Sequence, residues 1–328
     1  MHSIATPGIW AAFLLVLVAA LAVDFLVLRS AGAHRVSFRE AVYWSLAWVA
    51  LALAFNAGLW WWVDLHGGRE VANQVALEFL TGYLIEKSLA VDNIFVFLMI
   101  FNYFAVPPEQ RQRALMVGVL GAIVLRAILI VVGAALVARF HWILYLFGAF
   151  LLLTGIKMLF AANQEPDLDE NPMLRWMRRH LPLTRDFRGS LVSVVEHGRR
   201  WYTPLFVVMA LIAVTDVIFA VDSIPAIFAV TLDPFIVMSS NVFAVLGLRA
   251  MFFLLAGMAD RFHLLGHGLA LVLLFIGTKM LIAGVYKIPI GIALGVVALV
   301  LVGSVTASLL FPPREEAEAV EGGGERGD

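Results

Sequence analysis

Four acidic residues occur as two pairs inside long apolar stretches of the chain. Glu86 and Asp92 form the first pair, Asp216 and Asp222 form the second, and the acids of each pair are six residues apart. An ionised carboxylate at the centre of a bilayer costs at least ~2.5–3.5 kcal/mol, so such residues need a cation, bound protons or a basic partner. The pattern therefore indicates cation binding inside a membrane.

A neutral oxygen ligand follows the second acid of each pair, Asn93 in the first segment and Ser223 in the second. On a regular helix, residues seven apart share a face, whereas residues six apart are rotated by about 240°. A straight helix would therefore present Glu86 together with Asn93, and Asp216 together with Ser223. The second acid of each pair would be turned away.

Both acids of a pair can reach one site only if the helix is locally broken. Pro225 predicts a break in the second segment, because its ring frees the carbonyl of Val221 four residues earlier. Gly82 is a weaker breaker in the first segment. Oxygen ligands suit Mg²⁺, Ca²⁺ or Mn²⁺ and disfavour Zn²⁺ and Cu²⁺. The predicted metal ligands are Glu86, Asp92, Asn93, Asp216, Asp222 and Ser223.

An alternative is that the acids form structural ion pairs with basic residues inside the same apolar stretches, which are Lys87, Arg126, Lys157, Arg249 and Lys279. Arg126 and Arg249 lie deepest, and we expect both to pair with acids and to tune the site. Lys157 and Lys279 lie near the ends of their stretches, where their ammonium groups can reach water. Asp24 is an isolated acid, which we interpret as an interfacial or packing residue.

The composition places these residues in a polytopic membrane protein. The 328 residues are 62% hydrophobic and 14% charged, against about 25% charged in soluble domains. Apolar stretches long enough for the bilayer predict nine helices. They are Ile9–Leu28, Ala41–Val63, Val75–Phe101, Ala114–Ala138, Trp142–Leu159, Tyr202–Val230, Phe235–Met258, Leu264–Val285 and Ile288–Leu310. The first is longer than a signal-peptide core, and we expect it to be retained.

The chain contains an internal repeat. The two acidic motifs match, and three further landmarks follow in the same order, Leu-Arg-Ala at residues 125–127 and 248–250, Arg-Phe-His at 139–141 and 261–263, and Gly-x-Lys-Met-Leu at 155–159 and 277–281. Each copy covers three predicted helices, and an odd number inverts the second copy in the membrane. The fold class is therefore all-α, with an inverted three-plus-three repeat whose site lies near the midplane.

Lysine and arginine are distributed unevenly among the predicted loops. With the N-terminus outside, the inside-facing segments hold 15 of them and the outside loops 3, which predicts a cytoplasmic C-terminus. The predicted domains are two N-terminal helices (1–74), the first repeat (75–160), a cytoplasmic loop (161–201), the second repeat (202–285), a final helix (286–311) and a disordered acidic tail (312–328). Within the loop, residues 172–180 suit either a helix on the anionic inner leaflet or a solvated linker.

The two motifs resemble the signature motifs of the TerC family of integral membrane proteins. They read Glu-Lys-Ser-Leu-Ala-Val-Asp-Asn at 86–93 and Thr-Asp-Val-Ile-Phe-Ala-Val-Asp-Ser-Ile-Pro-Ala at 215–226. The resemblance implies a fold related to the LysE exporters, a role in manganese efflux, and the family's association with tellurium resistance. Members of the family often have serine where this chain has Ala90, so if that hydroxyl is a ligand in the family, this chain lacks it.

These observations predict a divalent cation exporter of the bacterial inner membrane, with Mn²⁺ as substrate, Ca²⁺ as the alternative, and protons as counter-ions. A second hypothesis is a membrane scaffold that recruits cytoplasmic partners through 161–201. We expect no enzyme, because the chain lacks a nucleophile elbow, a zinc-protease histidine pair and a phosphate loop. We also expect no resident cofactor and no nucleic-acid partner. The sequence does not decide whether the protein forms a homo-oligomer.

Overall fold

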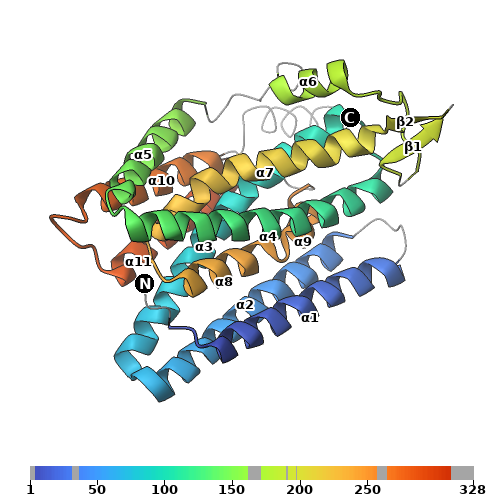
Figure 1. Ribbon diagram of the computed structural model, residues 1–328. Helices are drawn as coiled ribbons and strands as arrows, with labels where there is room; N and C mark the ends of the chain where they lie inside the picture. Colours follow the sequence, from blue (N-terminus) through green and yellow to red (C-terminus); the bar gives the residue numbers. More distant parts are fainter. Residues whose placement is uncertain are drawn as a thin grey trace, which may run out of the picture.

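A computed structural model describes residues 4–31, 37–161, 171–189, 191–196, 198–256 and 264–311. They form a helical bundle with one small β-hairpin (Figure 1). The elements are α1 (Pro7–Ala31), α2 (Phe38–Gly67), α3 (Arg69–Tyr103), α4 (Pro108–Arg139), α5 (Ile143–Ala161), α6 (Pro172–His180), β1 (Ser193–Glu196), β2 (Arg199–Tyr202), α7 (Pro204–Phe228), α8 (Pro234–Val245), α9 (Leu248–Ala256), α10 (Leu265–Ile282) and α11 (Ile290–Leu310). The tail expected to be disordered, 312–328, lies outside the described residues.

Most of these helices are long and apolar enough to cross a bilayer. Within the described residues seven qualify singly, α1, α2, α4, α5, α7, α10 and α11, and the bent pair of α8 and α9 adds an eighth. Helix α3 has 35 residues, but Glu86, Lys87 and Asp92 interrupt its apolar stretch. The expected all-α polytopic membrane bundle is confirmed, whereas the count of nine spans stays a prediction.

The seventh expected span is not one straight helix. Helices α8 and α9 meet at an angle of 40°, and Gly247 at the junction has a φ of +78°. A Cβ on Gly247 would lie 2.7 Å from Cγ of Trp48 in α2, so both the backbone conformation and the close contact require glycine. Residues 257 and 258, at the end of the predicted span, lie outside the described residues.

The break predicted at Pro225 is wrong. Helix α7 runs without interruption past this proline to Phe228. The proline removes one helical hydrogen bond, that to the carbonyl of Val221, and its neighbours Ala226, Ile227 and Phe228 are buried in the bundle, which holds the end of the helix in place. Gly82 does not break α3 either. It allows close packing instead, because a Cβ there would lie 2.8 Å from Oγ of Ser240 in α8.

The third helices of the two predicted repeats, α5 and α10, pack directly against each other. A Cβ on Gly148 would lie 3.1 Å from the carbonyl oxygen of Gly277, and one on Gly155 would lie 3.0 Å from that of Ala270. In the repeat alignment Gly155 matches Gly277, and Gly148 matches Ala270. Reciprocal contacts of this kind are those that a two-fold relation between the halves would produce.

Helices α1 and α2 run along one side of the bundle (Figure 1). Aromatic rings attach them to α8, since the ring of Phe55 in α2 lies 4.6 Å from that of Phe243, and the ring of Phe13 in α1 lies 5.8 Å from that of Phe235. Pairs in this distance range contribute about 0.5–1.5 kcal/mol each beyond their burial. The two helices outside the predicted repeat are therefore an integral part of the core.

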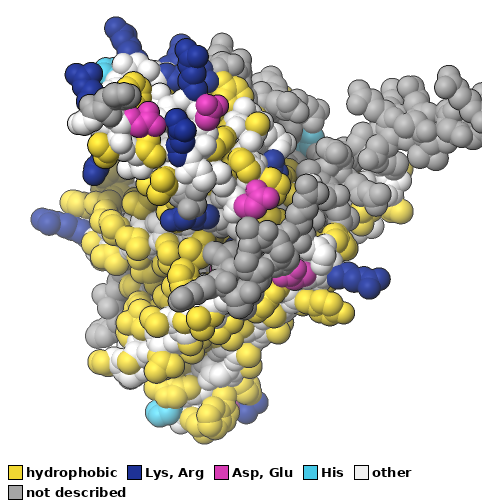
Figure 2. All heavy atoms as spheres, turned by 90° about the vertical axis from the view of Figure 1, so that its right-hand side faces the viewer, with side chains coloured by type: hydrophobic (Ala, Val, Ile, Leu, Met, Phe, Trp, Pro, Cys, Tyr) yellow, Lys and Arg dark blue, Asp and Glu magenta, His cyan; other side chains and the backbone are white. Residues whose placement is uncertain are grey.

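The segment between the repeats folds into a small lobe made of α6, β1 and β2. Helix α6 forms over the expected residues 172–180, with Asn171 capping its first turn. Leu174 and Met177 are buried in the same cluster as Leu205 and Val208 of α7, so this part of the loop is not a plain solvated linker. Trp176 stays exposed. Figure 2 faces this side of the molecule, and basic side chains gather at its top.

Candidate cation site

The buried faces of α3 and α7 carry matching polar residues. On α3, Glu86 and Asn93 are fully buried, with fully buried Ala90 between them. On α7, Asp216 and Ser223 are buried on one face, again with an alanine between them. The seven-residue spacing predicted this arrangement for straight helices, and both helices are continuous at these positions.

One guanidinium joins the two faces. Arg126 of α4 is buried and forms an ion pair with Glu86. Its Nη2 and Nε donate to the two carboxylate oxygens of Asp216 at 3.0 and 3.3 Å. Nη1 lies 3.5 Å from Oγ of Ser223. The first acids of the two motifs therefore share a single arginine, and with both acids ionised the group carries a net charge of −1.

This ion-paired group lies halfway along its helices. Glu86 is 17 residues from Arg69 and 17 from Tyr103, the two ends of α3. Asp216 is 12 residues from Pro204 and 12 from Phe228, the ends of α7. At 1.5 Å per residue, Asp216 lies about 18 Å from either end of α7. The acids are thus as far from both helix ends as the chain allows, as expected for a midplane site.

The second acid of α7 points elsewhere. Asp222 is half-buried and accepts a hydrogen bond of 3.3 Å from Thr154 of α5. Lys157, three residues further along α5, attracts it electrostatically. Asp92 is part of the helical backbone of α3, but its side chain lies outside the described part of the structure.

The two second acids lie on opposite sides of the central group. Helix α3 ends at the lobe, where Arg178 of α6 donates to the hydroxyl of Tyr103 at 2.9 Å. Helix α7 begins at the lobe, directly after β2. The two helices therefore run in opposite directions, and six residues correspond to about 9 Å. Asp92 is displaced toward the lobe and Asp222 away from it.

The predicted ligands whose side chains the structure describes do not converge on one point. Within the described part of the chain, no three side chains of His, Asp or Glu are close enough together to hold a metal ion. The structure brings Glu86, Asp216 and Ser223 to Arg126 and places Asp222 beside α5. The metal role of the predicted ligands, including Asn93 and Asp92, stays a prediction.

The second arginine behaves differently from the first. Arg249, which matches Arg126 in the repeat, donates from Nη2 to Oδ1 of Asp24 in α1 at 2.6 Å. The structure shows it paired with an acid as expected, but with one outside the predicted site. Sequence reasoning interpreted Asp24 as an isolated packing residue, because nothing in its spacing relates α1 to α9.

Comparison with known proteins decides the family. The TerC family of integral membrane proteins matches residues 71–316. This chain belongs to the TerC family. It is 55% identical, over 90% of its length and 92% of the relative's, to a protein of Salmonella typhi named as a proposed membrane-bound redox modulator, Alx. It is 47% identical, over 97% of its length and 98% of the relative's, to an uncharacterized membrane protein of Myxococcus xanthus. No solved structure matches it significantly.

Further polar groups of this TerC chain lie on α3 and α8. Asn241 of α8 is buried, and neither of its side-chain amide atoms has a partner among the described residues. Nζ of Lys87 donates to the carbonyl of Ala244 at 3.2 Å, a carbonyl that would accept from Leu248 if α8 continued. Sequence reasoning missed Asn241, although an amide within an apolar stretch was the available signal.

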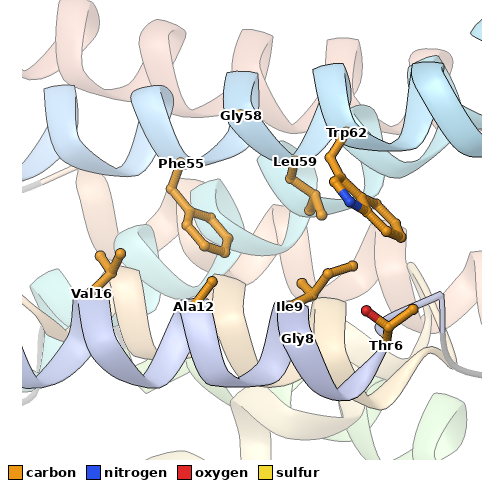
Figure 3. Close-up of a pocket in the computed structure, with 9 residues that line it drawn as sticks. All are labelled: Thr6, Gly8, Ile9, Ala12, Val16, Phe55, Gly58, Leu59 and Trp62. Atoms are coloured by element: carbon orange, nitrogen blue, oxygen red, sulfur yellow. The ribbon is translucent and has the colours of Figure 1, made fainter.

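The described cavity in this TerC chain is not the cation site. It has a volume of about 360 Å³ and lies between α1 and α2. Figure 3 shows Phe55, Leu59 and Trp62 pointing from α2 toward Ile9 and Ala12 of α1. Its lining contains no charged residue. An apolar cavity of this kind suits hydrocarbon and cannot replace the hydration shell of an ion.

Proposed function

We propose that this TerC protein exports divalent cations, with Mn²⁺ as the first substrate and Ca²⁺ as the alternative. The observation that carries the proposal is that two carboxylates from different helices share a single guanidinium in the middle of the bundle. These are Glu86 of α3 and Asp216 of α7, while Asp222 of α7 lies beside Thr154 and Lys157 of α5. A structural ion pair needs equal charges, whereas an ion site keeps negative charge for its substrate.

The kinds of atoms available support a hard cation. Oε2 of Glu86 and Oδ1 of Asn93 are buried and have no hydrogen-bond partner among the described residues. Buried polar atoms are nearly always paired, so unpaired oxygens on one helix face favour a ligand that accepts them. Carboxylate, amide and hydroxyl oxygens suit Mn²⁺, Mg²⁺ and Ca²⁺.

The antiparallel course of α3 and α7 suggests a path. An ion would pass Asp92 on the lobe side, the acids around Arg126 in the centre, and Asp222 on the far side. Carboxylates that the ion leaves would take up protons, which makes the transport an exchange with protons. Mn²⁺ uptake into vesicles at a rate that does not depend on pH would count against this coupling.

We place the protein in the bacterial inner membrane with its N-terminus outside and its C-terminus in the cytoplasm. The support is the excess of lysine and arginine in one set of loops. Many of these residues belong to the lobe, where Arg175, Arg179, Arg199 and Arg200 are exposed. We propose that the protein is a transporter and not an enzyme. Its ligand is the transported ion, and it holds no resident cofactor.

Uptake by reconstituted vesicles with the lobe facing outward tests the proposal. Mn²⁺, Ca²⁺, Mg²⁺ and Zn²⁺ would be compared, using Glu86→Gln and Asp222→Asn with Glu78→Gln as control. Glu78 lies on α3 as well, but it bonds Gln74 near the start of that helix. We expect Mn²⁺ uptake to fall at least tenfold in the first two variants and to stay within twofold in the control. Wild-type uptake no faster than that of protein-free vesicles would overturn the proposal.

The folded lobe favours a second candidate, a membrane scaffold. Helix α6 presents exposed Trp176 beside Arg175 and Arg179, a combination common at protein interfaces. The name of the Alx relatives suggests a redox role, but this chain has no cysteine, so any thiol chemistry would belong to a partner. Replacing the lobe by a flexible linker separates the two candidates. If the protein is a scaffold, the variant without the lobe should lose function in cells while its Mn²⁺ uptake in vesicles stays intact. If the protein is an exporter, Glu86→Gln should lose function in cells because its Mn²⁺ uptake is lost.

A further inference from the structure

We infer that Arg126 is a built-in substitute for the transported ion, and that a divalent cation binds between Glu86 and Asp216 by displacing its guanidinium. This inference rests on the proposed function. It adds that the guanidinium of Arg126 fills the ion site when no ion is bound, so that the return of this side chain promotes release of the ion.

The geometry shows that the guanidinium occupies the place of a cation. It contacts carboxylates from two different helices, and toward Asp216 it makes two parallel hydrogen bonds of 3.0 and 3.3 Å. The side chain of Arg126 is 2% exposed. The alanines between the polar residues, Ala90 and Ala220, are fully buried, so the space around it is filled by protein. A metal ion that uses oxygens of both Glu86 and Asp216 therefore competes with the guanidinium for them.

Charge balance keeps the two states of the exchange close in free energy, so that either can be favoured by the ion concentration. The two acids carry −2 and Arg126 returns +1, which leaves −1 in the ion-free state. A divalent cation bound in place of the arginine brings the acid pair to zero. The displaced guanidinium then needs an anion, and Asp222 can supply it only if its carboxylate turns away from Thr154 and Lys157 of α5.

Of the two arginines that match in the repeat, only Arg126 contacts the acid pair and can compete with a cation there. Arg249 lies at the matching place of the repeat, but Asp24 of α1 holds it at 2.6 Å. If both arginines faced the acid pair, the site would be neutral without metal and would have little attraction for a cation. Helix α1 thus keeps the second arginine occupied, and the two variants Arg126→Gln and Arg249→Gln form a matched pair.

The test measures binding and transport separately in the full-length protein. Mn²⁺ binding would be measured calorimetrically in lipid nanodiscs, and Mn²⁺ flux in vesicles. For Arg126→Gln we expect at least tenfold tighter Mn²⁺ binding and at least tenfold slower flux, because the ion no longer has a competitor. For Arg249→Gln we expect binding within threefold of wild type. Weaker or unchanged binding in a folded Arg126→Gln protein would overturn the inference and leave a purely structural ion pair.

Arg126→Lys keeps the test decisive if Arg126→Gln fails to fold. Lysine retains the charge but cannot make two parallel bonds to Asp216, so it should compete less well. We expect several-fold tighter Mn²⁺ binding with a normal unfolding temperature, and binding equal to or weaker than wild type would overturn the inference. If wild type neither binds nor transports Mn²⁺, the proposed function fails and this inference fails with it. If wild type does both, the Arg126 variants alone decide.

Discussion

Arg249 and Asp24 form an ion pair of 2.6 Å between a helix inside the predicted repeat and a helix outside it. The two side chains are 10% and 16% exposed, so the pair is largely removed from solvent. It fixes α1 to the start of α9, directly after the bend at Gly247. The N-terminal helices therefore have a structural reason to accompany the repeat.

Asp24→Asn should destabilise the protein by about 3 kcal/mol, because it leaves a guanidinium in the bundle without its carboxylate. The measurement is thermal unfolding in detergent. The double variant Asp24→Asn with Arg249→Gln should recover much of the loss, since no uncompensated charge remains. A double variant that is no more stable than Asp24→Asn would show that the cost does not come from the stranded charge.

Gly277→Ala should destabilise the protein by about 1–3 kcal/mol, the range for overpacking a close contact. A Cβ at this position would lie 2.8 Å from the carbonyl oxygen of Gly148 and 2.9 Å from the amide nitrogen of Leu152. Both are backbone atoms, so α5 and α10 must move apart. The control is Gly295→Ala in α11, where a Cβ meets nothing within 4 Å. Equal unfolding temperatures for the two variants would contradict the packing argument.

Much of the site followed from helical periodicity. The spacing of Glu86 with Asn93, and of Asp216 with Ser223, predicted the shared buried faces, because continuous helices fix these angles. The position of the acids halfway along α3 and α7 followed from the length of the apolar stretches. The helix at 172–180 also formed where the residue pattern suggested it.

Contacts between distant segments did not follow from the sequence. Periodicity shows which face is buried but not which helix covers it, so the sharing of Arg126 by two acids could not be derived. The bend of the seventh span was missed for a related reason. Gly247 looks like any glycine in an apolar stretch until Trp48 is placed against it, whereas Pro225 predicted a break that α7 does not have.

Thr154→Val should weaken Mn²⁺ transport about fivefold in KM, because one hydrogen bond contributes about 1 kcal/mol and 1.4 kcal/mol corresponds to tenfold. The hydroxyl of Thr154 donates to Oδ1 of Asp222 at 3.3 Å and orients this carboxylate. The matched control is Thr278→Val in α10, whose hydroxyl bonds the carbonyl of Leu274 in its own helix. The same KM change in both variants would mean that Asp222 is not oriented by α5.

Gly247→Ala should destabilise the protein more than Gly277→Ala or Gly295→Ala. An alanine at a φ of +78° costs about 1–2 kcal/mol in backbone strain, and its Cβ would lie within 2.8 Å of three atoms of Trp48. Adding Trp48→Ala should remove the steric clash but not the backbone strain. The difference in unfolding temperature between the double variant and Trp48→Ala should therefore be smaller than the difference between Gly247→Ala and wild type.

The bend between α8 and α9 also leaves the carbonyl of Ala244 open to Lys87. If this contact serves transport, Gly247→Ala should slow Mn²⁺ flux at temperatures where the protein is still folded. Full flux in a folded Gly247→Ala protein would show that the bend between α8 and α9 serves packing alone.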